Sequence, residues 1–171
     1  TRLHNQLHQA RAASERVFAL LATQKAVPEP LQPRLLRADN ADIQFDRVNF
    51  SYGEKIALRE INLQIKSGQL VALVGASGSG KTTVSNLLLR FYDPQQGSIK
   101  IGGANLREFS TRDLRNQIAV VAQENVLFND TIGRNIELGR LGATEAEILA
   151  AARFAKADEF ILQRPEGSNT L

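Results

Sequence analysis

The first 24 residues carry the hydrophobic pattern of an amphipathic helix. Apolar or small residues recur in steps of three and four, at Leu3, Leu7, Ala10, Ser14, Val17 and Leu21. This spacing places them on one face of a helix. A proline-rich stretch, 28–33, follows, and proline cannot continue a helix and favours extended backbone. We therefore expect a helix over 1–24, a linker over 25–38 and a folded domain over 39–171.

Two kinds of strand pattern follow the linker. Apolar residues stand between polar neighbours at Ile43, Phe45, Val48, Phe50, Leu63, Ile65, Ile99 and Ile101. This alternation predicts half-buried strands. Leu70–Val74 (LVALV) and Ile118–Ala122 (IAVVA) are instead almost wholly apolar, which is typical of strands buried on both faces of a parallel sheet. The pattern predicts an α/β fold with both kinds of strand.

Helical spacing appears in three places within the predicted domain. It links Val84, Leu87, Leu88 and Phe91, and a short helix is expected over Ser110–Asn116. Thr144 and Glu147 stand three residues apart before another apolar stretch. That pair is typical of a capping box, in which Thr144 caps the helix and Glu147 reaches back.

Composition narrows the class of protein. The 171 residues are 43% hydrophobic, which is enough for one good core and an appended segment. The 21 basic and 18 acidic residues give a net charge of +3, and the arginines are scattered, so no nucleic-acid partner is expected. No cysteine is present, which excludes disulfides and thiolate metal sites. No apolar run approaches the roughly 20 residues of a membrane span.

Two histidines near the start allow two interpretations. His4 and His8 are four residues apart, so they lie on one face of a helix and could bind a metal there. No acidic or further histidine partner lies nearby in the sequence. We therefore favour a solvated helix face.

The most informative motif is a glycine-rich loop between the apolar run Leu70–Val74 and the helix predicted from Val84 onward. Residues 75–83 read GASGSGKTT and match G-x-x-x-x-G-K-[ST], with candidate phosphate contacts at Gly75, Ser77, Gly78, Ser79, Gly80, Lys81, Thr82 and Thr83. Glycine permits the backbone angles with which consecutive N–H groups converge on an anion. Lys81 adds positive charge, the Thr82 hydroxyl suits Mg²⁺, and the helix N-terminus attracts phosphate.

A dinucleotide fingerprint is the competing interpretation of this loop. Gly78 and Gly80 would then require a further glycine at position 83, where this chain has Thr83. The alternative that a glycine- and serine-rich loop merely precedes Lys-Thr-Thr ignores the strand and helix on either side. We therefore predict a phosphate-binding loop.

Three further stretches carry a family resemblance. They are FSYG (Phe50–Gly53), RFYDPQQGSIKIGG (Arg90–Gly103) and VVAQENVLFNDTIGRNI (Val120–Ile136). With the glycine loop, they resemble the nucleotide-binding domain of an exporter-type ATP-binding cassette (ABC) transporter. The resemblance implies a P-loop NTPase core with a parallel sheet and an antiparallel β subdomain. ARAASERVFALL (10–21) is similar to the helix by which such exporters leave their last membrane span.

The resemblance also implies roles for individual residues. ATP and Mg²⁺ are the implied cofactors, Tyr52 stacks on adenine, and Lys81 and Gln123 are the catalytic residues, with Gln123 contacting Mg²⁺ and the attacking water. Residues 124–135 match the region that contacts the membrane domain. Tyr52 could instead be a core aromatic, and the apolar residues 126–128 could belong to the core of the domain itself.

Three motifs of the family are absent from this sequence. The signature LSGGQ, the apolar strand ending in Asp-Glu and the switch histidine stand downstream of the matched region in such domains, and no substitute is found here. We therefore expect the natural protein to continue beyond Leu171. The segment alone should bind nucleotide with little or no hydrolysis, and it should expose apolar surface.

Two function classes remain beside transport. In the transport interpretation, the complete protein lies at the cytoplasmic face of a plasma or inner membrane. It pairs with a second nucleotide-binding domain, as a homodimer or heterodimer, and hydrolyses ATP to drive export. A binding module without useful hydrolysis is the second interpretation. A small P-loop kinase with Arg134 and Arg140 as lid residues is the third, and the Val120–Ile136 resemblance argues against it.

Overall fold

The computed structural model describes residues 11, 14–15, 17–18, 21–22, 27–36, 41–122 and 126–171. The chain forms two compact units, Thr1–Ile118 and Ala119–Leu171. The described residues from 11 to 21 are helical, and Arg11 forms an ion pair with Glu15 at 2.8 Å, one helical turn away. The rest of the predicted helix, with His4 and His8, lies outside the described residues. Among the helices that the structure describes, none has the length and apolarity needed to cross a bilayer.

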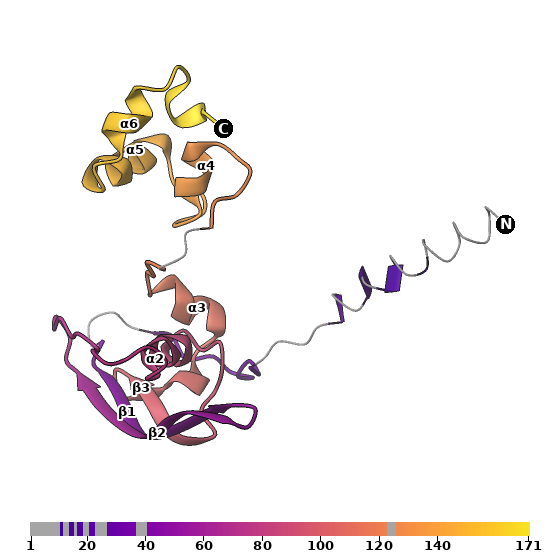
Figure 1. The fold of residues 1–171 in the computed structure, drawn as a ribbon, viewed down its shortest axis with the longest axis vertical. Coiled ribbons are helices and arrows are strands. Elements are labelled where there is room, and N and C mark those ends of the chain that lie inside the picture. The colour runs from indigo at the N-terminus through magenta and orange to yellow at the C-terminus, as the bar shows by residue number, and fades with distance from the viewer. Residues whose placement is uncertain are drawn as a thin grey trace. The chain divides into compact units, whose positions relative to one another are not determined.

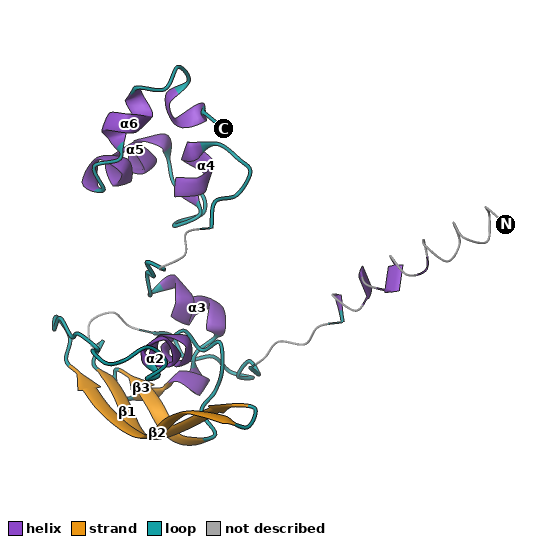
Figure 2. Ribbon diagram, viewed as in Figure 1, coloured by secondary structure: helices purple, strands orange, loops and turns teal. Residues whose placement is uncertain are grey.

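The first unit is built on a four-stranded antiparallel sheet in the order β2-β1-β3-β4. The strands are β1 (Ile43–Tyr52), β2 (Lys55–Ile65), β3 (Gln96–Ile101) and β4 (Ala104–Asn105) (Figure 2). A tight turn at Gly53 joins β1 to β2, with Tyr52 opposite Lys55. The half-buried strands predicted from alternation are confirmed.

A bulge in β1 changes which residues face the core. The register of β1 against β2 shifts between Phe45 and Val48, and Arg47 has the left-handed φ of 46°. Because of this extra residue, Phe45, Val48 and Phe50 are all buried, although strict alternation would separate them. Gly97 on β3 packs against this bulge so closely that a Cβ would overlap the carbonyl oxygen of Arg47.

Two helices cover one face of the sheet. They are α2 (Lys81–Leu88) and α3 (Thr111–Asn116), and the 3₁₀ helix η1 (Leu106–Glu108) precedes α3 (Figure 1). Ser110 caps α3 by accepting a hydrogen bond from the Asp113 amide at 3.0 Å, which agrees with the predicted short helix. The core consists of Phe45, Val48, Phe50, Leu58, Leu87, Ile99, Ile101, Ala104, Leu106, Phe109 and Leu114.

The two runs predicted as buried parallel strands require correction. Neither Leu70–Val74 nor Ile118–Ala122 forms a strand in the structure. Leu70 is 100% exposed, Val74 90% and Val121 98%. A parallel strand is buried only when neighbouring strands and covering helices surround it. In the part of the chain that the structure describes, these two runs have no such neighbours.

The second unit is helical. It contains α4 (Ile132–Glu137), α5 (Glu145–Phe154), α6 (Asp158–Leu162) and the 3₁₀ helix η2 (Gly167–Asn169). Among the described residues of this unit, Ala152 and Ile161 are the buried apolar ones. The Thr144 amide donates to the Glu147 carboxylate at 2.8 Å, and the Glu147 amide donates to the Thr144 hydroxyl at 3.4 Å. The predicted capping box is thus confirmed.

Candidate functional site

The glycine-rich loop is an exposed turn that leads directly into α2. Gly80 is the N-cap residue of α2, and no side chain accepts a hydrogen bond from the first turn of that helix. The first N–H groups of a helix have no partner within the helix and carry the positive end of its dipole. The N-terminus of α2 therefore offers donors to an anion.

Gly80 is required both by its backbone angle and by its packing. Its φ is +92°, a region that side chains rarely adopt. A Cβ at this position would stand 2.6 Å from Cδ2 of Leu58 and 2.8 Å from the carbonyl oxygen of Ala57. The loop end is thus pressed onto β2, and the sheet fixes the point from which α2 starts.

Lys81 turns back over the loop. Its ammonium group donates to the carbonyl oxygens of Gly75 at 2.9 Å and Ala76 at 2.8 Å, and it lies 3.4 Å from the Ser79 hydroxyl. The side chain thereby carries a positive charge into the turn formed by residues 75–80. Cation and helix N-terminus lie together, which is the electrostatic arrangement that a polyphosphate requires.

The two threonines after Lys81 have different environments. The side chain of Thr83 is buried, so its backbone N–H in the first turn of α2 is the group available to an anion. Thr82 is exposed, so its hydroxyl is accessible to a metal ion. Ser77, Gly78 and Ser79 are exposed in the loop itself. In the described ranges, no cluster of three or more His, Cys, Asp or Glu side chains forms a metal site.

Tyr52 stands at the end of β1 within an aromatic group. It packs edge-on against Phe50 and Tyr92, with ring centroids 4.8 and 5.2 Å away. Asn86 on α2 donates to its hydroxyl at 3.2 Å. Tyr52 remains 37% exposed, whereas Phe50 is buried, so Phe50 is the core aromatic of this group. Sequence reasoning missed the contacts of Asn86, which lies on α2, and of Tyr92, which lies after α2 in the stretch Arg90–Gly103.

Gln123 lies outside the described residues, as do 124 and 125. The described continuation, Val126, Leu127 and Phe128, is exposed and does not belong to the core of its own unit. The Phe128 amide donates to the Asn135 side-chain oxygen at 2.8 Å, and the Asn135 amide group donates to the carbonyl oxygen of Phe128 at 3.1 Å. Asn135 therefore holds this apolar loop in place.

The arginines that a kinase interpretation would use are engaged in ion pairs. Arg134 contacts Glu137 at 2.6 Å, and Arg140 contacts Glu147. These contacts raise the pKa of both arginines and lower the pKa of Glu137. Hydrogen bonds from Arg140 and Thr144 lower the pKa of Glu147 to about 2. Both arginines are thus used within the second unit.

Comparisons with known proteins agree on one family. The family model described as "ABC transporter" matches residues 58–168. The chain is 42% identical over 170 residues to an "ATP-dependent lipid A-core flippase" of Desulfotalea psychrophila, covering 99% of this chain and 30% of that protein. It is 48% identical over 170 residues to a protein of the same name from Alkalilimnicola ehrlichii, covering 97% and 28%.

A solved structure gives the same result. It is titled "Structure of a bacterial Atm1-family ABC exporter with ATP bound", and the TM-score is 0.85 at 37% identity. The match covers 98% of this chain and 29% of that one. The chain therefore spans less than a third of the length of the relatives that it matches.

Proposed function

The chain belongs to the ABC transporter family, and from this premise we propose that its loop Gly75–Thr83 binds the phosphates of ATP with Mg²⁺. The structural match supports the ABC ATPase fold class, with its antiparallel sheet. The observation that carries the proposal is the ammonium group of Lys81, held in the loop by the carbonyl oxygens of Gly75 and Ala76 at the uncapped N-terminus of α2.

The loop binds phosphate by replacing its internal contacts with contacts to the ligand. Lys81 can pivot from the loop carbonyls to phosphate oxygens, because its side chain is long and flexible. The amides of Gly80, Lys81 and Thr82 donate from a fixed position, because α2 is anchored by buried Leu87. The site thus combines a rigid set of donors with one mobile cation.

We assign Tyr52 to stacking against the adenine base of ATP. An aromatic ring offers a flat, polarisable surface for stacking, and partial exposure leaves part of that ring accessible. Asn86 and Tyr92 contact the ring and restrict its orientation before a ligand binds. Less conformational entropy of the side chain is therefore lost on binding. Tyr52 therefore acts as a preorganised contact for adenine.

Thr82 is the residue of the described loop that would hold Mg²⁺, with Gln123 as the second ligand. A hydroxyl and an amide oxygen are hard oxygen donors of the kind that Mg²⁺ prefers. The metal neutralises charge on the phosphates when bound. Lys81 and Gln123 are the proposed catalytic residues of the complete protein.

For the complete protein we propose ATP-driven export. Relatives in Staphylococcus aureus carry names such as "Putative multidrug export ATP-binding/permease protein". The exposed apolar residues 126–128, braced by Asn135, support residues 124–135 as the contact with a membrane domain. A second nucleotide-binding domain completes the catalytic arrangement at the cytoplasmic face, and residues 1–171 alone bind nucleotide with little or no hydrolysis.

Calorimetric titration with ADP and Mg²⁺ tests the site. Lys81→Ala should weaken binding at least 10-fold and change the free energy of unfolding little, because the hydrogen bonds of the ammonium group to the loop lie at the surface. Lys100→Ala on β3 is the charge-matched control and should bind as the unchanged chain does. Equal affinity of all three proteins would contradict the phosphate assignment.

The adenine assignment has a separate test. Tyr52→Ala should weaken ADP binding several-fold and leave the affinity for pyrophosphate unchanged, because only ADP carries a base to stack. A parallel loss for both ligands would show that Tyr52 supports the loop and does not contact adenine. Phosphate release from ATP should be absent for residues 1–171 and present for the complete protein.

A further inference from the structure

The stretch predicted as a linker is attached to the first unit at several points. We call residues 27–36 the strap. Val27 is buried, and the Arg34 amide donates to the Glu108 carbonyl oxygen at 2.8 Å. Arg34 also forms a parallel bridge with Phe109. The polypeptide that arrives from the N-terminal helix is therefore fixed before it enters β1.

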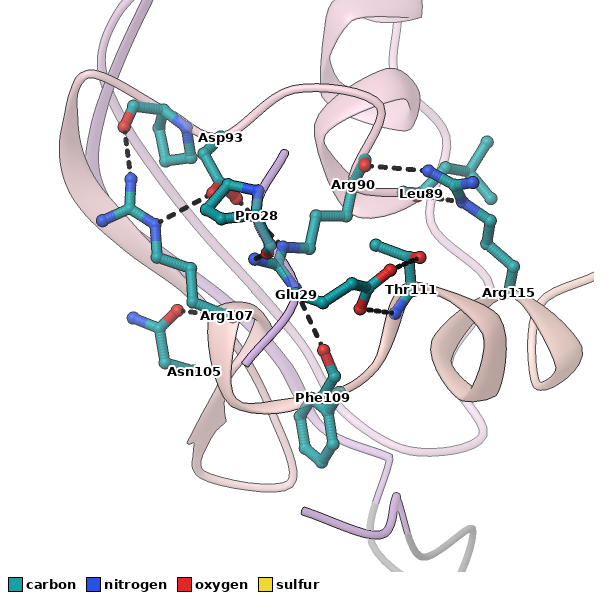
Figure 3. Close-up of polar contacts among 11 residues, drawn as sticks. Pro28, Glu29, Leu89, Arg90, Asp93, Asn105, Arg107, Phe109, Thr111 and Arg115 are labelled. Carbon is teal, nitrogen blue, oxygen red and sulfur yellow. Dashed lines mark hydrogen bonds and ion pairs between the residues drawn. The ribbon is translucent and has the colours of Figure 1, made fainter. Parts of the chain in front are cut away.

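One buried arginine joins the strap to the end of the phosphate-loop helix. Arg90 follows α2, has a left-handed φ of 52° and is 1% exposed. Its guanidinium group donates to the carbonyl oxygens of Pro28 at 2.8 Å and Phe109 at 3.0 Å, and to the Asp93 carboxylate at 3.1 Å. Figure 3 shows these contacts. The proposed phosphate site uses none of them.

Helix α3 reinforces the same junction from the other side. Arg115 donates to the carbonyl oxygens of Leu89 at 2.9 Å and Arg90 at 3.0 Å, which satisfies groups that the end of α2 leaves open. The Glu29 carboxylate of the strap accepts hydrogen bonds from the Thr111 amide, at 3.0 Å, and the Thr111 hydroxyl (Figure 3). The strap, α2 and α3 thus share one polar network.

Because of this network, the strap cannot move without a cost in free energy unless α2 moves with it. A guanidinium group that loses an acceptor in the interior is left with an unsatisfied, charged donor. Helix α2 has 8 residues, so its ends are only about 12 Å apart. Buried Thr83 and Leu87 fix it between the loop at one end and Arg90 at the other. A shift at the junction is therefore transmitted to the loop.

We propose that Arg90 is a positioning residue that couples docking of the strap to nucleotide binding at Gly75–Thr83. This inference rests on the proposed function of that loop. Docking of the strap fixes the C-terminal end of α2, and α2 in turn fixes the donors at its N-terminus. Because linkage is reciprocal, bound nucleotide must stabilise strap docking by the same factor by which docking tightens nucleotide binding.

Two backbone amides report on strap docking. The Arg34 amide donates to Glu108 and the Thr111 amide donates to Glu29, so both bonds cross the contact between the strap and the unit. Their hydrogen exchange is measured by NMR in the 171-residue chain, with and without saturating ADP and Mg²⁺. We expect nucleotide to slow exchange at both amides about 5- to 20-fold, within the usual range of coupling.

Arg90→Lys tests the coupling itself. Lysine keeps the charge and loses the planar fork that reaches three acceptors. We expect this variant to bind ADP about 5- to 20-fold more weakly and to lose the nucleotide-induced protection of Arg34. Arg112→Lys changes an exposed arginine on α3 and serves as the matched control, with no effect on either readout.

Glu29→Gln keeps the test decisive if Arg90→Lys does not fold. Glu29 is exposed, so the fold should persist while the bonds to Thr111 weaken. We expect Glu29→Gln to lower both ADP affinity and nucleotide-induced protection in the same direction. Lys81→Ala should keep the strap protected without nucleotide and make that protection insensitive to ADP.

Several outcomes separate this inference from the proposed function. If Arg90→Lys, or Glu29→Gln where the first does not fold, lowers only the melting temperature, the network is merely structural and the inference is wrong, while the nucleotide site stands. The same conclusion follows if ADP leaves exchange at Arg34 unchanged in the original chain. If that chain does not bind ADP at all, the proposed function fails and the inference fails with it.

Discussion

Apolar residues are buried in the sheet of the first unit, whereas apolar residues in the run before the glycine loop are exposed. Phe45 is 2% exposed and Val48 0%, whereas Leu70 is 100% exposed and Val74 90%. The sheet strands find partners in adjacent hairpins of the same chain, and the loop-flanking run finds none in the described residues. An apolar pattern thus indicates that a segment can be buried. The segment is buried only when another element packs against it.

The sharpest test of this contrast is a large-to-small change in the sheet. Phe45→Ala removes a fully buried ring from the shared core of β1, β3 and α2. It should lower the free energy of unfolding by about 3 to 5 kcal/mol, measured by chemical denaturation. A loss below about 1 kcal/mol would show that this core is not what stabilises the unit.

The second prediction compares two glycines of the loop. Gly78 and Gly80 both have a left-handed φ, but only Gly80 packs against β2. Gly78→Ala should destabilise the first unit by about 1 kcal/mol, from backbone strain alone. Gly80→Ala should cost more than about 2 kcal/mol, because the Cβ also overlaps the Ala57 carbonyl. Equal thermal stability of the two variants would mean that the loop end is not pressed onto the sheet.

The third prediction concerns the capping box of Thr144 and Glu147 in the second unit. The folded pKa of Glu147 is about 2, below its ordinary 4.5. A depressed carboxyl pKa stabilises the folded state above pH 4.5, and this contribution is lost as the pH falls towards 2. The protection of the α5 amides, corrected for the intrinsic exchange rate at each pH, should therefore fall over this window. Glu147→Gln should remove that pH dependence, and a variant that retains it would contradict the assignment.

The smallest effect is expected at the exposed run. Val74→Ser should change the free energy of unfolding by less than about 0.5 kcal/mol, because the side chain is in solvent. It should reduce self-association in sedimentation experiments, since exposed apolar residues promote contacts between copies. A loss comparable to that of Phe45→Ala would remove the contrast between the two regions.

Sequence patterns predicted the elements that depend on nearby residues. The hairpin strands, the short helix near Ser110–Asn116, the Thr144–Glu147 box and the glycine loop each follow from residues close in sequence. The bulge at Arg47 and the contacts of Arg90 depend on residues far apart in the chain, and no local pattern marks them. The two apolar runs were misassigned because their burial requires partner strands.

In the candidate site, too, the features given by a local motif were predicted, and those that depend on the fold were not. The loop and Lys81 were visible in the motif, and the placement of Lys81 on Gly75 and Ala76 came from the fold. The contacts that hold Tyr52, from Asn86 and Tyr92, were not foreseen, because they depend on how α2 and the segment after it pack against the end of β1. The roles of Tyr52 and Gln123 stay predictions.

The most direct test of the central claim is an NMR titration of the ¹⁵N-labelled chain with ADP and Mg²⁺. The amide signals of Gly78, Gly80, Lys81 and Thr82 should shift together with a single binding constant. In Lys81→Ala the same shifts should require at least 10-fold more ADP. Signals that stay unchanged in residues 75–83, or that move only in residues 126–171, would contradict a phosphate site in this loop.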